Sequence, residues 1–460
     1  MSAFPSTNAR CARRCRRAAR VAFMLAAAFA VANPAPALAS RPGTDVVLGK
    51  TVAERSIDAS EMPDIVAAQA IVVDPDGTAY FERDADKHVK IASITKVMTA
   101  IVALENAELD STVTVDHAAA TVGEATANLQ EGDTMTLEAA LHGLLISSGN
   151  DAALAIASSV GKLIDPDSSD PTATFVDAMN KKAAELGCKD TKFTNPHGLD
   201  IDAWKADMYS TARDVATMFA HAMKNETFRK VIASDADPIT VTTADGGTRR
   251  AEQTSHNHIL GKEGNIGGKT GTTGDAGQCF VGAFSRKDGG DVYVVELGST
   301  SDDQRFADTL ALATWYYGHV AAVPFAKSPA SQGGVPILAR ATFADWSDKT
   351  VGVTLEKPEQ TARVFSLAGA ITQDVQLDRL SGNIEQGRAA GTITYTQAGK
   401  QVGKAALVTA ESKAAPNPIE WIMVQFDRVV RFFTGKPGEA ASIVLNEAPD
   451  PLAYDSWDAA

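Results

Sequence analysis

The spacing of apolar residues changes along this chain, and the first stretch has the pattern of a β-hairpin. Residues 70–73 form an apolar run, "DPDG" has the composition of a turn, and residues 78–82 form a return strand. The next segment, "SITKVMTAIVALE", repeats apolar residues at helical spacing. The pattern predicts a hairpin followed by an amphipathic helix that starts at Ser93.

Helical periods dominate the middle of the chain. They cover residues 136–148, 149–160, 172–187 and 210–225. Strand patterns return at 278–299 as two runs around a Gly-Gly turn, and residues 302–318 have helical spacing again. Strands at both ends with helices between them predict an α+β domain over residues 62–320, in which helices pack on one antiparallel sheet.

The C-terminal part has a different pattern. Short alternating strands over residues 335–412 predict a small all-β domain. Residues 416–436 predict an amphipathic helix whose apolar face holds Ile419, Ile422, Met423, Phe426, Val429, Val430 and Phe433. Such a helix lies in a membrane interface or packs on the β domain, and we favour the membrane. The acidic residues 437–460 predict a disordered tail.

The N-terminal 39 residues have the layout of a secretory signal peptide. Residues 10–20 hold six arginines, residues 21–32 are apolar, and residues 37–39 read Ala-Leu-Ala, an A-x-A cleavage site. The alternative is an uncleaved anchor, but the apolar stretch is shorter than the roughly 20 residues that span a bilayer. We expect export, with residues 40–61 as a linker.

The composition fits a soluble globular protein, with 45% hydrophobic and 22% charged residues. Removal of the signal peptide, with six arginines and no acidic residue, takes the formal net charge from −14 to −20, which disfavours nucleic-acid binding. Cys188 and Cys279 remain, and the sequence leaves open whether they pair. No zinc-type motif occurs, so we expect neither a metal nor another cofactor.

The stretch "GNIGGKTGTTG" at residues 264–274 suggests a phosphate-binding loop, but its spacing is wrong. A P-loop requires Gly-x-x-x-x-Gly-Lys-Ser/Thr. Counting back from Gly268 places Glu263 where the first glycine belongs, and its carboxylate would repel a phosphate. The sequence therefore argues against nucleotide binding.

Ser93-Ile94-Thr95-Lys96 is a Ser-x-x-Lys motif at the start of the predicted helix. Residues three apart share a helix face, so the amine can reach the serine oxygen and, when neutral, act as its base. Burial or a nearby cation would lower the lysine pKa enough for that role. A second such motif, at 159–162, lies inside a helical segment, and we interpret it as structural.

Two further motifs follow in a meaningful order. Ser148-Gly149-Asn150 opens a predicted helix, where the alternative is an ordinary helix cap. Lys269-Thr270-Gly271 comes later in the chain. Residues 255–257 and 381–383 repeat the Ser-x-Asn form, so order and context must discriminate. Ser-x-x-K, Ser-x-Asn and Lys-Thr-Gly in this order are typical of active-site serine penicillin-recognising enzymes.

Four longer stretches resemble the serine D-alanyl-D-alanine carboxypeptidases, the low-molecular-mass penicillin-binding proteins. They are residues 70–105, 129–157, 193–200 and 267–289. The resemblance covers roughly residues 62–318 and, weakly, the β domain and terminal helix. It implies the penicillin-recognising serine-enzyme fold, with the Lys-Thr-Gly motif on a strand that borders a peptide site. It also implies a location outside the cytoplasmic membrane or in the cell-wall space.

The resemblance implies that Ser93 attacks the carbonyl between the two terminal D-alanines of a peptidoglycan stem peptide. Lys96 would be the general base, and Ser148 would relay a proton to the leaving amine. Water would then hydrolyse the acyl-enzyme, whereas β-lactam antibiotics would be trapped at that stage.

The same resemblance implies a set of substrate contacts. Asn150 would hydrogen-bond the substrate amide, and Lys269 with Thr270 would receive the terminal carboxylate beside Gly271. The N–H groups of Ser93 and Thr272 would form the oxyanion hole. Arg305 resembles a family arginine near the carboxylate pocket, although a surface ion pair is the alternative.

Rival functions are a β-lactamase, a transpeptidase and a non-catalytic wall-binding protein. β-Lactamases of this fold carry Ser-Asp-Asn and a Glu-x-x-Leu-Asn loop, and no Leu-Asn pair occurs between Asn150 and Lys269. The intact motifs argue against a decayed enzyme, while transpeptidation stays open because water and an amine compete for one acyl-enzyme. We interpret His197, His256 and His258 as structural, because no Gly-x-Ser-x-Gly elbow occurs.

Overall fold

The computed structural model describes residues 41, 43–287 and 289–451. The predicted signal peptide at 1–39 lies outside these residues. Among the described residues, no helix is long and apolar enough to cross a membrane.

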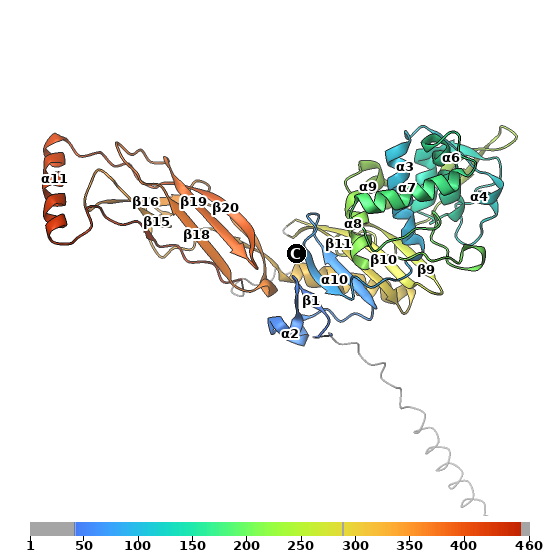
Figure 1. Cartoon of the computed structure of the whole chain (residues 1–460), viewed down its shortest axis with the longest axis horizontal. Helices are drawn as coiled ribbons and strands as arrows, with labels where there is room; N and C mark the ends of the chain where they lie inside the picture. The colour runs from blue at the N-terminus through green and yellow to red at the C-terminus, as the bar shows by residue number, and fades with distance from the viewer. Residues whose placement is uncertain (1–40, 42, 288, 452–460) are drawn as a thin grey trace, which may run out of the picture. The chain divides into compact units, whose positions relative to one another are not determined.

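A seven-stranded antiparallel sheet forms the centre of the N-terminal domain (Figure 1). Its order is β2-β1-β4-β3-β11-β10-β9. The strands are β1 (Val46–Val47), β2 (Lys50–Thr51), β3 (Gln69–Val73), β4 (Ala79–Arg83), β9 (Asn265–Thr273), β10 (Gly277–Arg286) and β11 (Gly290–Ser299). The predicted hairpin is therefore β3–β4, and the Lys-Thr-Gly motif lies on β9, an edge strand.

Both faces of this sheet are covered, which explains why its strands read as continuous apolar runs. On β3, Ile71 and Val73 join the core beneath the helical layer, whereas Ala70 and Val72 join the core on the other face. Helix α10 (Asp302–His319) packs against β11 and β10 and closes that second core. The alternation follows from the two-residue period of a strand.

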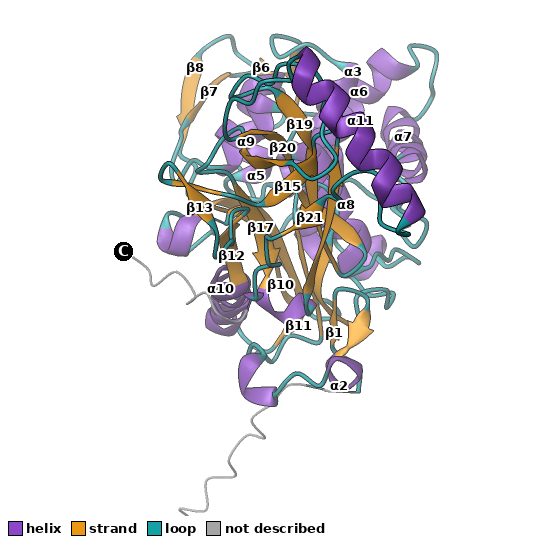
Figure 2. Cartoon of the chain, turned by 90° about the vertical axis from the view of Figure 1, so that its left-hand side faces the viewer, coloured by secondary structure: helices purple, strands orange, loops and turns teal. Residues whose placement is uncertain are grey.

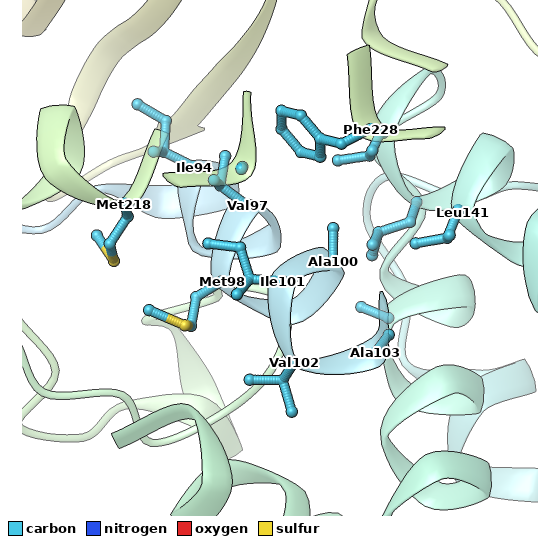
Figure 3. Close-up of a cluster of buried hydrophobic side chains, with 14 of the residues drawn as sticks. Ile94, Val97, Met98, Ala100, Ile101, Val102, Ala103, Leu141, Met218 and Phe228 are labelled. Carbon is cyan, nitrogen blue, oxygen red and sulfur yellow. The ribbon is translucent and has the colours of Figure 1, made fainter. Parts of the chain in front are cut away.

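The helical layer contains α4 (His117–Thr121), α5 (Leu137–Leu145), α6 (Asn150–Ile164), α7 (Pro171–Glu185), α8 (Ala212–Ala222) and α9 (Glu226–Ile232). Helix α3 (Lys96–Asn106) contacts four of them, α5 to α8. Residues 96–103 are all buried, and Figure 3 shows apolar side chains on every side of α3. The prediction of an amphipathic helix is therefore wrong, because neighbouring helices enclose α3.

A second, four-stranded sheet was not predicted. It has the order β5-β6-β7-β8, from β5 (Thr112–Thr114), β6 (Thr134–Thr136), β7 (Ile239–Thr242) and β8 (Thr248–Ala251). Strands of three or four residues are too short to show a clear two-residue period, so the sequence pattern missed them.

The described part of the segment predicted as a linker, residues 41 and 43–61, belongs to the folded domain instead. Strand β1 pairs with β4, and β2 is followed by the short helix α2 (Val52–Arg55). Asp45 forms an ion pair at 2.8 Å with Arg83, and both side chains are fully buried. A buried, hydrogen-bonded ion pair fixes this segment to the sheet.

The C-terminal domain is built of β-strands, as predicted. Its six-stranded sheet has the order β18-β19-β20-β16-β15-β21. The strands are β15 (Ala339–Thr342), β16 (Thr350–Leu355), β18 (Ile371–Leu377), β19 (Ala389–Gln397), β20 (Lys400–Thr409) and β21 (Ile443–Val444). Two strand pairs accompany it, β12 (Val320–Pro324) with β17 (Thr361–Phe365) and β13 (Ser331–Gln332) with β14 (Val335–Pro336).

Part of the predicted disordered tail is ordered. Strand β21 pairs with β15, and Asn446 is buried, where its amide donates to Phe325 O and Tyr395 Oη. The acidic composition of the segment hid these buried hydrogen bonds. Residues 452–460 lie outside the described residues.

Helix α11 (Pro418–Phe433) forms where it was predicted, and Figure 2 shows it as one uninterrupted helix. Asn417 and Glu420 close its N-terminus with a capping box. All seven residues of the predicted apolar face are exposed, with Phe426 at 72%. Polar contacts hold the helix to the β domain, among them Arg428 to Ala344 O. The apolar face therefore does not pack on the β domain.

Candidate active site

The turn before α3 places Ser93 and Lys96 side by side. Residues Ala92–Thr95 form a 3-10 turn, and α3 continues from Lys96. Ala92 is fully buried with a left-handed backbone, φ 48°, which is rare for a residue with a Cβ and is commonly found at functional sites. Lys96 Nζ donates a hydrogen bond to Ser93 Oγ at 2.9 Å, the contact that the spacing predicted.

Lys96 is completely buried, and three oxygens surround its amine. Besides Ser93 Oγ, the amine donates to Asn150 Oδ1 and to the backbone oxygen of His197, each at 2.8 Å. Burial, followed by the positive charge of Lys269, lowers the pKa of Lys96 well below its ordinary value. The site thus favours the neutral amine, which is the form that can accept a proton.

Ser148 and Asn150 enter the site at the start of α6. Ser148 has a left-handed backbone, φ 60°, and Gly149 occupies the cap position without a side-chain hydrogen bond. The alternative interpretation of this motif as a helix cap is therefore wrong. Asn150 Nδ2 donates to Gly123 O at 3.0 Å while Oδ1 accepts from Lys96. Asn150 orients Lys96 in the free protein.

Lys269 reaches Ser148 from strand β9. Its amine donates to Ser148 Oγ at 2.8 Å and to Thr270 O at 2.9 Å, and only 2% of the residue is exposed. Burial, then the charge of Arg305, lowers the pKa of Lys269 to about 7. Two lysine–serine pairs, from three separate segments of the chain, therefore meet in one buried site.

Gly271 allows β9 to approach the turn that carries Ser93. A Cβ on Gly271 would lie 2.6 Å from the backbone oxygen of Ile91 and 3.3 Å from Ala92 Cβ. Any side chain at this position would push β9 away from Ser93. The glycine of the Lys-Thr-Gly motif is thus required by packing.

Arg305 lies beside the last residues of this motif. The residue is 5% exposed, and Nη1 donates to Thr272 Oγ1 at 2.9 Å and to Gly271 O at 3.3 Å. The same nitrogen donates to Gln278 Oε1 at 2.9 Å. Its other terminal nitrogen, Nη2, pairs with Asp302, so the structure shows Arg305 both beside the motif and in an ion pair. Thr270 is 5% exposed and Thr272 is exposed.

Sequence reasoning missed the groups that hold the site from behind. The backbone oxygen of His197 binds Lys96, and Ala125 O accepts from Asn150 N at 2.8 Å. Asp151 accepts the backbone N–H groups of Ala127 and Leu129 and so fixes the neighbouring loop. Backbone oxygens have no residue signature, so nothing in the local sequence marks them.

His197 and Ser159, which were interpreted as structural, behave accordingly. His197 is fully buried, burial lowers its pKa to about 2, and its ring packs edge-on against Trp204 at 4.4 Å. Ser159 lies inside α6, where its hydroxyl accepts from Thr114 N. Cys188 and Cys279 are both buried free thiols, so they do not pair. Over the described residues, no cluster of three or more His, Cys, Asp or Glu side chains fits a metal ion.

The arrangement supplies the parts of nucleophilic acyl transfer. A buried amine with a lowered pKa contacts the Ser93 hydroxyl, as a general base must. A second hydroxyl, that of Ser148, accepts a hydrogen bond from a second buried amine, that of Lys269. Lys269 on β9 and Arg305, which reaches the same strand from α10, are both basic side chains. Together they favour an anionic ligand beside β9.

A family comparison agrees with this chemistry. The profile of peptidase family S11, D-alanyl-D-alanine carboxypeptidase, matches residues 56–301. The D-alanyl-D-alanine carboxypeptidase DacF of Bacillus subtilis (strain 168) is 25% identical over 357 residues, which cover 75% of this chain and 85% of that protein. DacB2 of Mycobacterium tuberculosis, with the same enzyme name, is 36% identical over 227 residues, 49% of this chain and 72% of that protein.

A solved structure is similar to the N-terminal part of the chain. The crystal structure of the Streptomyces K15 DD-transpeptidase has a TM-score of 0.51 and 32% sequence identity. The match covers 55% of this chain and 98% of that one. The expected penicillin-recognising serine-enzyme fold is thereby confirmed.

Proposed function

This chain belongs to the D-alanyl-D-alanine carboxypeptidase family of serine peptidases, and we propose that it removes the terminal D-alanine from peptidoglycan stem pentapeptides. The observation that carries the proposal is the contact between the buried Lys96 amine and Ser93 Oγ. In the proposed reaction, neutral Lys96 takes the hydroxyl proton while Ser93 Oγ bonds to the carbonyl carbon between the two D-alanines.

The tetrahedral oxyanion is then held by the N–H groups of Ser93 and Thr272, each contributing about 3 kcal/mol. Ser148 relays the proton held by Lys96 to the leaving nitrogen, the carbon–nitrogen bond breaks, and D-alanine departs. Lys269 and Arg305 attract the terminal carboxylate, with Thr270 as a further donor. Asn150 holds Lys96 through Oδ1, and the second N–H of its amide nitrogen would donate to the substrate while the first binds Gly123 O.

Water completes the cycle by attacking the ester on Ser93, which frees the enzyme and the shortened peptide. A β-lactam carries a strained amide and a carboxylate, and it acylates Ser93 by the same route. Its leaving group stays tethered and shields the ester from water, so we expect β-lactams to inhibit the enzyme.

Mass spectrometry of the intact mature chain tests the nucleophile. We expect benzylpenicillin to add one acyl group to the wild type and to Ser159→Ala, the matched motif inside α6, but none to Ser93→Ala. D-alanine release from a stem pentapeptide then separates an enzyme from a passive binder. Intact penicillin and an unmodified wild type would favour a non-catalytic protein, while rapid hydrolysis would favour a β-lactamase.

Transpeptidation is the second candidate, because the similar Streptomyces K15 structure is that of a DD-transpeptidase. An amine that replaces water would convert the same acyl-enzyme into a new peptide bond. Addition of an amino-acid acceptor to the peptide reaction decides between them. A ligated product would mean transfer, and free shortened peptide alone would mean hydrolysis.

The chain is also proposed to be exported and to rest on a membrane surface through α11. The exposed apolar face of that helix supports this location, since burial of a large apolar side chain contributes about 1.5–3 kcal/mol. Flotation with liposomes, with and without residues 416–436, tests it. Equal flotation of both proteins would remove the anchor.

A further inference from the structure

The loop that carries His256 and His258, together with the start of α10, borders the pocket proposed for the terminal carboxylate. The ring of Phe306 contacts both sides of this region, with the His258 ring at 5.2 Å between centroids and Arg305 Cζ at 5.0 Å from the ring centre. Phe306 is 5% exposed and therefore forms a fixed support. His258 and Arg305 are held on one aromatic side chain.

Asp302 lies between these two residues and uses one oxygen for each. Oδ1 forms an ion pair with Arg305 Nη2, and Oδ2 lies 3.4 Å from His258 Nδ1. The other terminal nitrogen of Arg305, Nη1, faces Thr272 and Gln278. An internal carboxylate thus binds the arginine proposed to receive the carboxylate of the substrate.

We propose that His258 and Asp302 are specificity-determining residues, which set how strongly Arg305 attracts the terminal carboxylate; this inference rests on the proposed function. While His258 is neutral, Asp302 cancels the charge of Arg305 and competes with the incoming carboxylate. Once His258 is protonated, the three side chains carry one net positive charge, and Arg305 binds the substrate more tightly.

The neighbouring His256 shows that the charges of Lys269 and Arg305 act on this loop. Partial burial, then the charges of Lys269 and Arg305, lower the pKa of His256. His258 itself is faced by Asp302 and Phe306 from α10 and by His256 from its own loop. Asp302 is the only negatively charged group among these, and its carboxylate is shared between His258 and Arg305.

The test measures KM and kcat for D-alanine release from a stem pentapeptide at about pH 5.5 and about pH 8.5, on either side of the imidazole range. We expect His258→Gln to raise KM about threefold over the wild type at the lower pH, and to leave KM and kcat unchanged at the higher pH. The ratio to the wild type cancels the titration of Lys269, which both proteins share.

Asp302→Asn should lower KM at the higher pH, because the competing carboxylate is gone, and it should abolish the effect of His258→Gln in the double variant. Asp302→Glu should restore the wild-type ratio. His88→Gln is the matched control, since His88 Nε2 lies 2.8 Å from Asp190 Oδ1 in another exposed pair. An equal KM ratio at both pH values, or the same shift in the control, overturns the proposal.

A second reaction separates a failure of this inference from a failure of the proposed carboxypeptidase activity. If no variant releases D-alanine, the rate at which benzylpenicillin acylates Ser93 gives the same comparison, since that ligand also carries a carboxylate. A pH-dependent ratio of acylation rates then retains the role of His258 without the carboxypeptidase activity. Loss of both reactions in the wild type overturns both proposals.

Discussion

Helices α3 and α11 carry similar apolar residues in opposite environments. On α3, residues 96–103 are all buried between four neighbouring helices. On α11, Val424 is the one buried hydrophobic residue, and Ile422 is 63% exposed. The first helix lies in the core and begins with the proposed base, while the second meets solvent with its apolar face.

The difference shows what apolar packing does for each part of the molecule. Around α3 it excludes water from Lys96, and that burial is the largest cause of its lowered pKa. The exposed apolar face of α11 has no such packing in the described chain, and polar contacts to the β domain together with local interactions hold the helix. They include its capping box and the ion pair of Asp427 with Arg431 at 2.6 Å.

The largest effect should come from removing the buried amine. We expect Lys96→Met to lower kcat about 10³-fold or more, because no base remains for Ser93. Thermal stability should fall only modestly, because Asn150 Oδ1 and the His197 oxygen lose a donor while a desolvated amine is removed. D-alanine release and a thermal melt measure the two effects. Activity within a factor of ten of the wild type would show that Lys96 is not the base.

The second prediction substitutes the same residue type in both helices. Ile101→Ala should lower the free energy of unfolding by about 2–5 kcal/mol, because it leaves a cavity in the core. Ile422→Ala should change it by less than about 0.5 kcal/mol in the absence of lipid. Urea unfolding of both variants gives the comparison. Similar losses would mean that the face of α11 is covered in solution.

The third prediction adds a lipid surface. Ile422→Asp should weaken vesicle binding at least about tenfold, since an ionised side chain replaces one that the bilayer would bury. Leu163→Asp is the control, because Leu163 is also an exposed hydrophobic residue, at 55%, but lies on α6. A co-sedimentation assay measures both. Equal losses would indicate a general charge effect and would exclude α11 as the contact.

The smallest effect concerns the second buried lysine. The pKa of Lys269 is lowered to about 7, so the positive charge is present below that pH and lost above it. We expect kcat/KM to fall severalfold as the pH rises from about 6 to about 8, because the substrate carboxylate loses its partner. Lys269→Arg keeps the charge and should remove most of this fall in kcat/KM. An unchanged fall in the variant would mean that another group causes it.

Local patterns predicted the elements whose signals lie within a few residues. The β3–β4 hairpin follows from two apolar runs around Asp-Pro-Asp-Gly, and the contact of Lys96 with Ser93 follows from a three-residue spacing on a helical turn. The amphipathic pattern of α11 required no partner elsewhere in the chain. These features depend on backbone periodicity, which the sequence carries directly.

The tertiary structure decided everything that required distant segments to meet. It enclosed α3 on all sides, joined β1 and β21 to their sheets, and brought the His197 oxygen to Lys96. It also placed Lys269 on Ser148, across 121 residues of chain. The sequence determined which side chains could perform the chemistry. Packing determined their pKa values, because burial and neighbouring charge exist only once the chain has folded.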